Sequence, residues 1–263
     1  MCPDIGSQAG SIGQIAIAEL FAAASKGDFN RVQAMLYGGA SILDADNHLG
    51  QMTLMLVIKA GRADLVFALI NRGVNVNRQT RQGETALALS KARGLHEITR
   101  LLKGFGLWQA ARDGDLPSLK LMLAEGADVK AMTSDGWTAL SIAALKGYQE
   151  IMHALLKNGA DANARNGDGW TPLMLATSLA DIETIEILLS AGADPNLQDQ
   201  SGWTALMQAV AERNVLSAQA LLAAGADVCV MSAAGETALL IASQRGYAET
   251  VELLEHYGAK RLD

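Results

Sequence analysis

The chain is poor in the residues and segments that mark secreted, membrane-spanning or disulfide-linked proteins. Only 5% of its 263 residues are aromatic, and its two cysteines, Cys2 and Cys229, match no metal-ligand or redox spacing. No apolar run approaches the roughly 18 residues of a membrane span. Residues 1–13 lack the basic start and apolar run of a secretory signal. We therefore expect reduced thiols, no membrane insertion and a cytoplasmic location.

Basic residues are outnumbered. The sequence has 28 acidic and 21 basic residues, for a net charge of −7. This balance argues against a protein that binds the phosphate backbone of nucleic acids and favours basic or neutral partners. Hydrophobic residues make up 50% of the chain, and with so few aromatics the core must be packed by alanine and leucine. Alanine is the best helix former, so this composition suits closely packed helices.

Catalytic and metal-binding patterns are also missing. There is no phosphate-binding loop, no Gly-x-Ser-x-Gly elbow and no His/Cys cluster with ligand spacing. The histidines are predicted in separate elements, in a hairpin, at the start of an outer helix, inside an outer helix and in the last helix: His48, His96, His153 and His256. Asp44, Asp46 and His48 are similar to the start of a calcium loop, but Met55 stands where the bidentate glutamate belongs. We predict no catalytic residue, no metal site and no cofactor.

What the chain has instead is a repeated signature, Gly-x-Thr-Ala/Pro-Leu. It recurs every 33 residues, at 136–140, 169–173, 202–206 and 235–239. A period of this length is typical of solenoids, which offer extended surfaces more readily than closed pockets. Within one repeat, Asp168-Gly169 predicts a turn, Thr171 a helix cap and Pro172 a first helical turn. A second helix follows and ends near Gly192, whose left-handed conformation suits a helix end.

The repeat resembles the ankyrin repeat, whose Thr-Pro-Leu-His-x-Ala opening and Gly-Ala-Asp-x-Asn closing are nearly all present. Closings stand at 126–128, 159–163, 192–196 and 225–227. The resemblance implies an all-α fold, an α-solenoid of about eight helix-turn-helix repeats with β-hairpin fingers. The leucines that begin the inner helices would be Leu20, Leu54, Leu87, Leu107, Leu140, Leu173, Leu206 and Leu239. The second repeat is irregular, since its motif at 50–54 has slipped.

One interval is short. Leu87 and Leu107 are 20 residues apart, so we predict that one finger is deleted between repeats 3 and 4 and that residues 104–106 join two helices. The expected organisation is a tail at 1–13, a first array of three repeats at 14–106 and a second array of five at 107–263. We favour continuous stacking of the arrays, because exposed repeat faces would lose about 25 cal/mol per Å² of apolar burial. A hinge at 104–106 is the alternative.

The histidine of the family motif is replaced in every repeat. The residues in its place are Met55, Ala88, Trp108, Ser141, Met174, Met207 and Leu240. We expect its hydrogen bonds to give way to apolar packing, with the methionines filling the core. Cys229 stands where the closing asparagine is expected and is interpreted as a small, partly buried substitute.

The resemblance implies binding through the concave side, which is built from finger tips and inner helices. The residue after the motif glycine points that way, and it is Trp137, Trp170 and Trp203 in three consecutive repeats. With helices about 8–10 Å apart, the indoles would form a ladder. Exposed tryptophans anchor many protein interfaces, so we hypothesise that this ladder binds a partner. Alternatively, each indole packs on the neighbouring finger and stiffens it.

Other side chains are predicted to surround the ladder. They are Asp135 and Asp168 on the fingers, and Leu145, Lys146, Leu179 and Glu212 where inner helices end. An aromatic centre with an acidic rim suggests a basic, partly apolar peptide or helix. The aspartates have a simpler interpretation, because Asp-Gly pairs are ordinary turn formers.

These observations predict a monomeric, non-catalytic protein-interaction module, such as an adaptor, inhibitor or scaffold. It would grip a partner protein and bind neither nucleic acid nor membrane. Two alternatives stay open. One is an effector or enzyme-associated protein with an unrecognised site, for example near Phe105 and Trp108. The other is a structural module that self-associates through the same tryptophans.

Overall fold

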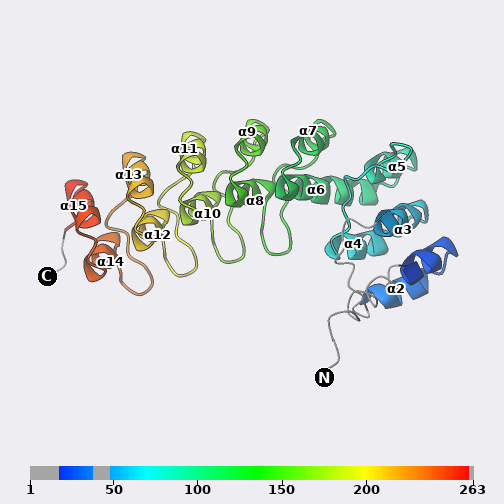
Figure 1. Ribbon diagram of the computed structural model, residues 1–263, viewed down its shortest axis with the longest axis horizontal. Helices are drawn as coiled ribbons and strands as arrows, with labels where there is room; N and C mark the ends of the chain where they lie inside the picture. The colour runs from blue at the N-terminus through cyan, green and yellow to red at the C-terminus, as the bar shows by residue number, and fades with distance from the viewer. Residues whose placement is uncertain (1–17, 38–47, 261–263) are drawn as a thin grey trace, which may run out of the picture. The chain divides into compact units, whose positions relative to one another are not determined.

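The computed structural model describes residues 18–37 and 48–260, and these form helices joined by turns (Figure 1). The predicted tail at 1–13, Cys2, Asp44 and Asp46 lie outside the described residues. Within the described part no segment is a strand, although two isolated antiparallel bridges pair Gln79 with Thr85 and Met132 with Thr138. The all-α solenoid is confirmed.

Helices alternate between an inner and an outer set. The inner helices are residues 18–25, α3 (His48–Lys59), α5 (Ala86–Ala92), α8 (Ala139–Lys146), α10 (Pro172–Ser178), α12 (Ala205–Ala211) and α14 (Ala238–Gln244). The outer helices are α2 (Phe29–Tyr37), α4 (Ala63–Asn71), α7 (Leu116–Ala124), α9 (Gln149–Lys157), α11 (Ile182–Ser190), α13 (Val215–Ala223) and α15 (Ala248–His256). One longer helix, α6 (His96–Asp113), belongs to both sets.

The chain divides into two compact units. The first comprises residues 1–110 and 124–127, and the second comprises residues 111–123 and 128–263. In the first, α3 packs against α4 and α5. In the second, α8, α10, α12 and α14 pack side by side, and α9, α11, α13 and α15 form a second row beside them (Figure 1). No helix among the described residues is both long and apolar enough to cross a membrane.

A threonine sets the start of each short inner helix. Its side-chain oxygen accepts a hydrogen bond from the backbone nitrogen three residues later, which satisfies one orphan donor of the first turn. The capping threonines are Thr85, Thr138, Thr171, Thr204 and Thr237. The signature therefore fixes where each helix begins, and with it the register of the loop before it.

Leucine two residues after the capping threonine fills the core, as predicted. All eight aligned leucines are buried, with exposed fractions between 0% and 6%: Leu20, Leu54, Leu87, Leu107, Leu140, Leu173, Leu206 and Leu239. The methionines at the family's histidine position are buried as well: Met55, Met174 and Met207. Ser141 differs from the expectation of apolar packing alone, because its hydroxyl accepts a hydrogen bond from the backbone nitrogen of Thr138 at 2.8 Å.

The second repeat departs from the prediction. His48 was expected in a hairpin, but it is the first residue of α3, and the slipped motif at 50–54 lies inside this helix. Thr53 is no longer a cap, since its hydroxyl donates to the carbonyl oxygen of Leu49 at 2.8 Å, one turn earlier in the same helix. Without a capping threonine at the usual place, the helix extends toward the N-terminus.

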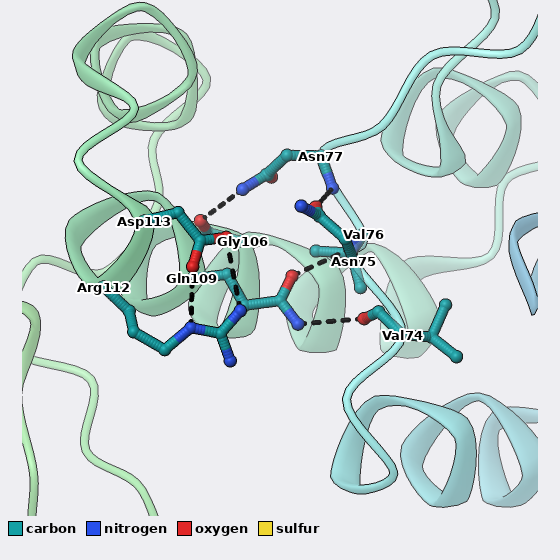
Figure 2. A network of polar contacts seen from close by, with 8 residues as sticks. All are labelled: Val74, Asn75, Val76, Asn77, Gly106, Gln109, Arg112 and Asp113. Atoms are coloured by element: carbon teal, nitrogen blue, oxygen red, sulfur yellow. Dashed lines mark hydrogen bonds and ion pairs between the residues drawn. The ribbon is translucent and has the colours of Figure 1, made fainter. Parts of the chain in front are cut away.

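The predicted joint at 104–106 is also continuous helix, because α6 runs from His96 to Asp113 without a break. No Ser, Thr, Asp or Asn stands in this stretch to cap a new helix. Gln109 of α6 instead satisfies a neighbouring loop of the same compact unit: its Oε1 accepts from Val76 N, and its Nε2 donates to Val74 O, each at 2.9 Å (Figure 2). Asn77 Nδ2 donates to Gly106 O at 2.8 Å.

Candidate partner-binding face

Five fingers share one hydrogen-bond scheme. We use "finger" for each loop that precedes an inner helix: residues 79–85 in the first compact unit, and residues 132–138, 165–171, 198–204 and 231–237 in the second. The tryptophans occupy the same place in three of them. Thr133 N donates to Trp137 O at 2.9 Å, and Asn166 N and Asp199 N donate in the same way to Trp170 O and Trp203 O. The carbonyl of each tryptophan therefore closes the base of its finger.

The backbone nitrogen of each tryptophan is held as well. It donates to a side chain four residues earlier: Trp137 N to Thr133 Oγ1 at 3.1 Å, Trp170 N to Asn166 Oδ1 at 2.8 Å, and Trp203 N to Asp199 Oδ1 at 2.9 Å. Thr, Asn and Asp are the residue types that make such local turns. With both backbone groups bonded and a helix cap directly after it, each tryptophan has a fixed main-chain position.

Neighbouring fingers are tied at their tips by backbone hydrogen bonds. Gly167 N donates to Asp135 O at 2.8 Å, Gln200 N to Asp168 O at 3.0 Å, and Ala233 N to Ser201 O at 2.9 Å. Asp135 and Asp168 thus take part in the finger row through their main-chain carbonyl groups. Their side chains are exposed to solvent.

Two side chains that the sequence analysis missed add a second set of ties. Gln198 Nε2 donates to Gly202 O of its own finger at 2.7 Å and to Met231 O of the next finger at 2.9 Å. Arg165, 33 residues earlier, makes the equivalent pair of bonds to Gly169 O and Gln198 O. The signal was available, since both residues occupy the same repeat position and carry several donors. The three tryptophan-bearing fingers therefore belong to one hydrogen-bonded row.

The predicted binding residues differ in exposure. The three tryptophans are half-buried, as is Leu145. Lys146 and Glu212 are exposed, and Leu179 exposes 50% of its surface although it is apolar. None of the indoles makes a ring contact with another aromatic side chain within the described residues. Each of the three tryptophans is therefore partly packed and partly exposed to solvent.

The four histidines lie on separate helices, and the described residues form no metal-binding cluster. His48, His96 and His256 lie at helix ends and His153 inside α9, on four different helices. No group of three or more His, Cys, Asp or Glu residues in this part of the chain could hold a metal ion. Cys229 is exposed, so its interpretation as partly buried is wrong. Phe105 and Trp108, predicted beside an unrecognised site, are half-buried in α6.

One ion pair perturbs a pKa. Arg62 Nε and Nη2 donate to both carboxylate oxygens of Asp64, at 2.9 and 2.6 Å. This hydrogen bonding lowers the pKa of Asp64 below its ordinary value and raises the pKa of Arg62. The pair lies at the start of α4 in the first compact unit, so its effect is on that helix and not on the tryptophan-bearing fingers.

Comparison with known proteins extends the sequence motif to nearly the whole chain. A family model described as ankyrin repeats matches in three copies, at residues 20–105, 107–199 and 180–261. The match includes the irregular second repeat and all of helix α6 except Gly106, which falls between two copies. All five fingers lie within a matched segment, and so do the inner helices other than the first, which begins two residues before the match.

Curated relatives match over shorter stretches. The chain is 30% identical over 92 residues to inversin of Mus musculus, which is 35% of this chain and 9% of that protein. It is 30% identical over 150 residues to the E3 ubiquitin-protein ligase KEG of Arabidopsis thaliana, 48% of this chain and 9% of that protein. It is 46% identical over 46 residues to the human Notch-regulated ankyrin repeat-containing protein, 18% of this chain and 40% of that protein. The matched segments thus span less than half of each of these relatives.

Proposed function

The chain belongs to the ankyrin repeat family, and from that premise we propose that it is a non-catalytic interaction module, an adaptor, inhibitor or scaffold. The observation that carries the proposal is the position of Trp137, Trp170 and Trp203. They stand at the same place in three consecutive fingers, with their backbones held and their indoles half-buried. Preorganised aromatic side chains bind at low entropic cost, and so they are favoured interface anchors.

The partner is a protein that lies along the concave face. Its centre contacts the three indoles, and its edges meet Asp135 and Asp168 on the fingers and Leu145, Lys146, Leu179 and Glu212 at the ends of inner helices. This rim carries three carboxylates and one ammonium group, on a chain with net charge −7. Complementary charge steers association, so we propose that the partner is basic where it meets the rim.

The test compares the parent chain with one triple variant and one double variant. The first is W137A/W170A/W203A. The control is L121A/L216A, which removes two exposed leucines, 48% and 64% exposed, from outer helices of the same compact unit. The melting temperatures of all three proteins are measured first, and each protein is then used to capture partners from a lysate of the source cells.

A partner that is retained by the parent and the control but lost from the tryptophan variant supports the proposal. Identical partners for all three proteins would contradict it. If the tryptophan variant instead melts at a markedly lower temperature while still capturing the same partner, the indoles stiffen the fingers and do not bind.

Sedimentation of the parent at two concentrations separates a monomer from self-association through the same tryptophans. The cytoplasmic location and the continuous stacking of the arrays 14–106 and 107–263 remain predictions.

A further inference from the structure

The first compact unit contains a cleft of about 390 Å³ that belongs to no predicted site. Its walls are the helix at residues 18–25, helix α3 and the finger at residues 79–85. The volume falls within the range of roughly 300–1,000 Å³ that is typical of ligand sites. The cleft lies apart in sequence from the tryptophan-bearing fingers, all of which are in the second compact unit.

One face of α3 forms the main wall. His48, Met52, Met55 and Lys59 all line the cleft, and their spacings of four, three and four residues place them on one side of the helix. This face exists because α3 starts earlier than the other inner helices and is 12 residues long. The irregular second repeat thus produces a surface that the regular repeats lack.

The opposite walls are held in place by hydrogen bonds. Gln51 of α3, which is 5% exposed, donates through Nε2 to Arg78 O at the start of the finger, at 2.8 Å. Inside the finger, Thr80 N donates to Glu84 O at 2.9 Å, and Thr80 Oγ1 accepts from Glu84 N at 3.1 Å. The cleft is therefore preformed, and binding a ligand does not require the entropic cost of ordering its walls.

The floor of the cleft is apolar, and its rim carries cationic side chains. Phe21, Met52, Met55 and Leu56 supply apolar surface, and Met52 remains 36% exposed. Methionine adapts its shape to different apolar ligands, which is why it is frequent on peptide-binding surfaces.

The rim cations Lys59 and Arg81 are both exposed, and neither forms an ion pair with any residue that the structure describes. Elsewhere in the same compact unit, Lys91 pairs with Glu125 and Arg62 with Asp64. Among the lining residues that the structure describes, Glu84 carries the one carboxylate. The lining therefore carries an excess of positive charge on a chain whose net charge is −7.

We propose that this cleft binds an acidic segment of a partner protein that carries a large apolar side chain. The apolar side chain packs against Phe21, Met52 and Met55, and flanking carboxylates meet Lys59 and Arg81. Charge complementarity with Lys59 and Arg81, which form no ion pair among the described residues, identifies the acidic character of the segment. The site is independent of the tryptophan ladder and has the opposite preference for charge, so one chain joins an acidic segment and a basic partner.

The first experiment selects peptides without assuming a sequence. Random 12-residue peptides displayed on phage are selected on the immobilised full chain carrying W137A/W170A/W203A, so that the ladder contributes nothing. Enriched peptides are synthesised with a fluorescent label, and their affinity is measured by fluorescence anisotropy. We expect Asp or Glu on both sides of Leu, Phe or Met. A selection that yields only neutral or basic peptides would overturn the proposal.

Three variants then locate the site. K59E/R81E should weaken binding at least tenfold, whereas K120E/K157E, which reverses two exposed lysines of the other compact unit, should leave it unchanged. E84Q removes the repelling carboxylate and should tighten binding severalfold. Equal affinities for the parent and K59E/R81E at matched melting temperatures would contradict the cleft. All of these measurements use the chain without the ladder tryptophans. A negative result for the cleft therefore does not contradict the proposed role of the ladder, and a negative result for the ladder does not contradict the cleft.

Discussion

A methyl group added to Gly202 would lie 2.6 Å from the backbone nitrogen of Ala233 in the next finger. This nitrogen is the donor that ties the fingers together through Ser201 O. Substituting Gly202 therefore tests the finger row directly, because any side chain must push the next finger away.

Gly202→Ala is expected to destabilise the chain by about 2–4 kcal/mol, the sum of a left-handed backbone cost of about 1 kcal/mol and the displaced contact. The matched control is Gly235→Ala. Gly235 has nearly the same φ, +78° against +76°, but an added Cβ there meets nothing closer than 3.9 Å. Urea unfolding followed by circular dichroism gives both values. If both variants lost the same free energy of unfolding, the close contact between Gly202 and Ala233 would not contribute to stability.

Two non-glycine residues hold left-handed backbone conformations at the ends of inner helices. Ala180 has φ +58° and Arg213 has φ +56°. The equivalent residues of the neighbouring repeats, after α8 and α14, are the glycines Gly147 and Gly246. Ala180→Gly should stabilise the chain by about 0.5–1 kcal/mol, because it relieves the conformational strain. Arg213→Gly should gain less, since it also removes a guanidinium that lies 5.5 Å from the ring centroid of Tyr247. Thermal melts of both variants rank them, and a lower melting temperature for Ala180→Gly would contradict the argument.

The sequence motif predicts those features that one repeat determines by itself. Thr138, Thr171 and Thr204 cap helices by accepting from a backbone nitrogen three residues later, and Leu140, Leu173 and Leu206 are buried at the position that the motif assigns to the core. The candidate ladder was equally accessible, since its spacing is the repeat period. Its position in the fingers follows from the motif, whereas its use in binding remains a proposal.

What the sequence analysis missed depends on long-range contacts or on missing signals. Arg165 and Gln198 visibly share a repeat position, but their hydrogen-bond acceptors lie 33 residues away in the next finger, and the sequence does not identify those acceptors. Helix α3 extends to His48, and α6 is continuous, because neither stretch has a capping residue at the usual place. When the capping residue is missing, the sequence does not indicate where the helix begins or ends. The cleft beside α3 combines both, because Arg81 meets the apolar face of α3 only once the finger at 79–85 is folded.

The pKa of Asp64 makes a small part of the stability pH-dependent. Hydrogen bonding from Arg62 lowers this pKa below 3.8, so the folded state favours the carboxylate. The resulting stabilisation is fully present above the ordinary pKa of an aspartate and is lost as the pH falls through the lowered pKa of Asp64 in the folded chain. Since the Asp64 side chain is 47% exposed, solvent screening limits the effect to a few tenths of a kcal/mol, about 0.3–0.5.

Asp64→Asn should therefore lower the free energy of unfolding slightly at pH 7, and the difference from the parent should disappear as the pH falls through the lowered pKa of Asp64. The control is Glu150→Gln, which changes the same position of α9, the second residue of the helix. Glu150 has no ion pair among the described residues, so this variant reports only the charge near a helix start. A pH-independent difference for Asp64→Asn would exclude the ion pair as its cause.

Gln109 offers the sharpest test of how the continuous helix is accommodated. Its amide is the hydrogen-bond partner of two backbone groups, Val76 N and Val74 O, and it is only 2% exposed (Figure 2). Gln109→Leu keeps the volume but leaves a donor and an acceptor without these bonds. Since each unsatisfied buried group costs about 1–3 kcal/mol, we expect a loss of about 2–5 kcal/mol in urea unfolding.

The control for this change is Gln51→Leu. Gln51 is also buried, at 5% exposure, but its side chain has a single bond, to Arg78 O. Its replacement should cost about half as much, because one acceptor and not two backbone groups loses its partner. Gln109→Glu adds a second comparison, since a carboxylate still accepts from Val76 N but repels Val74 O. Equal stability of Gln109→Leu and the parent would mean that water replaces the amide, and that α6 does not depend on this side chain.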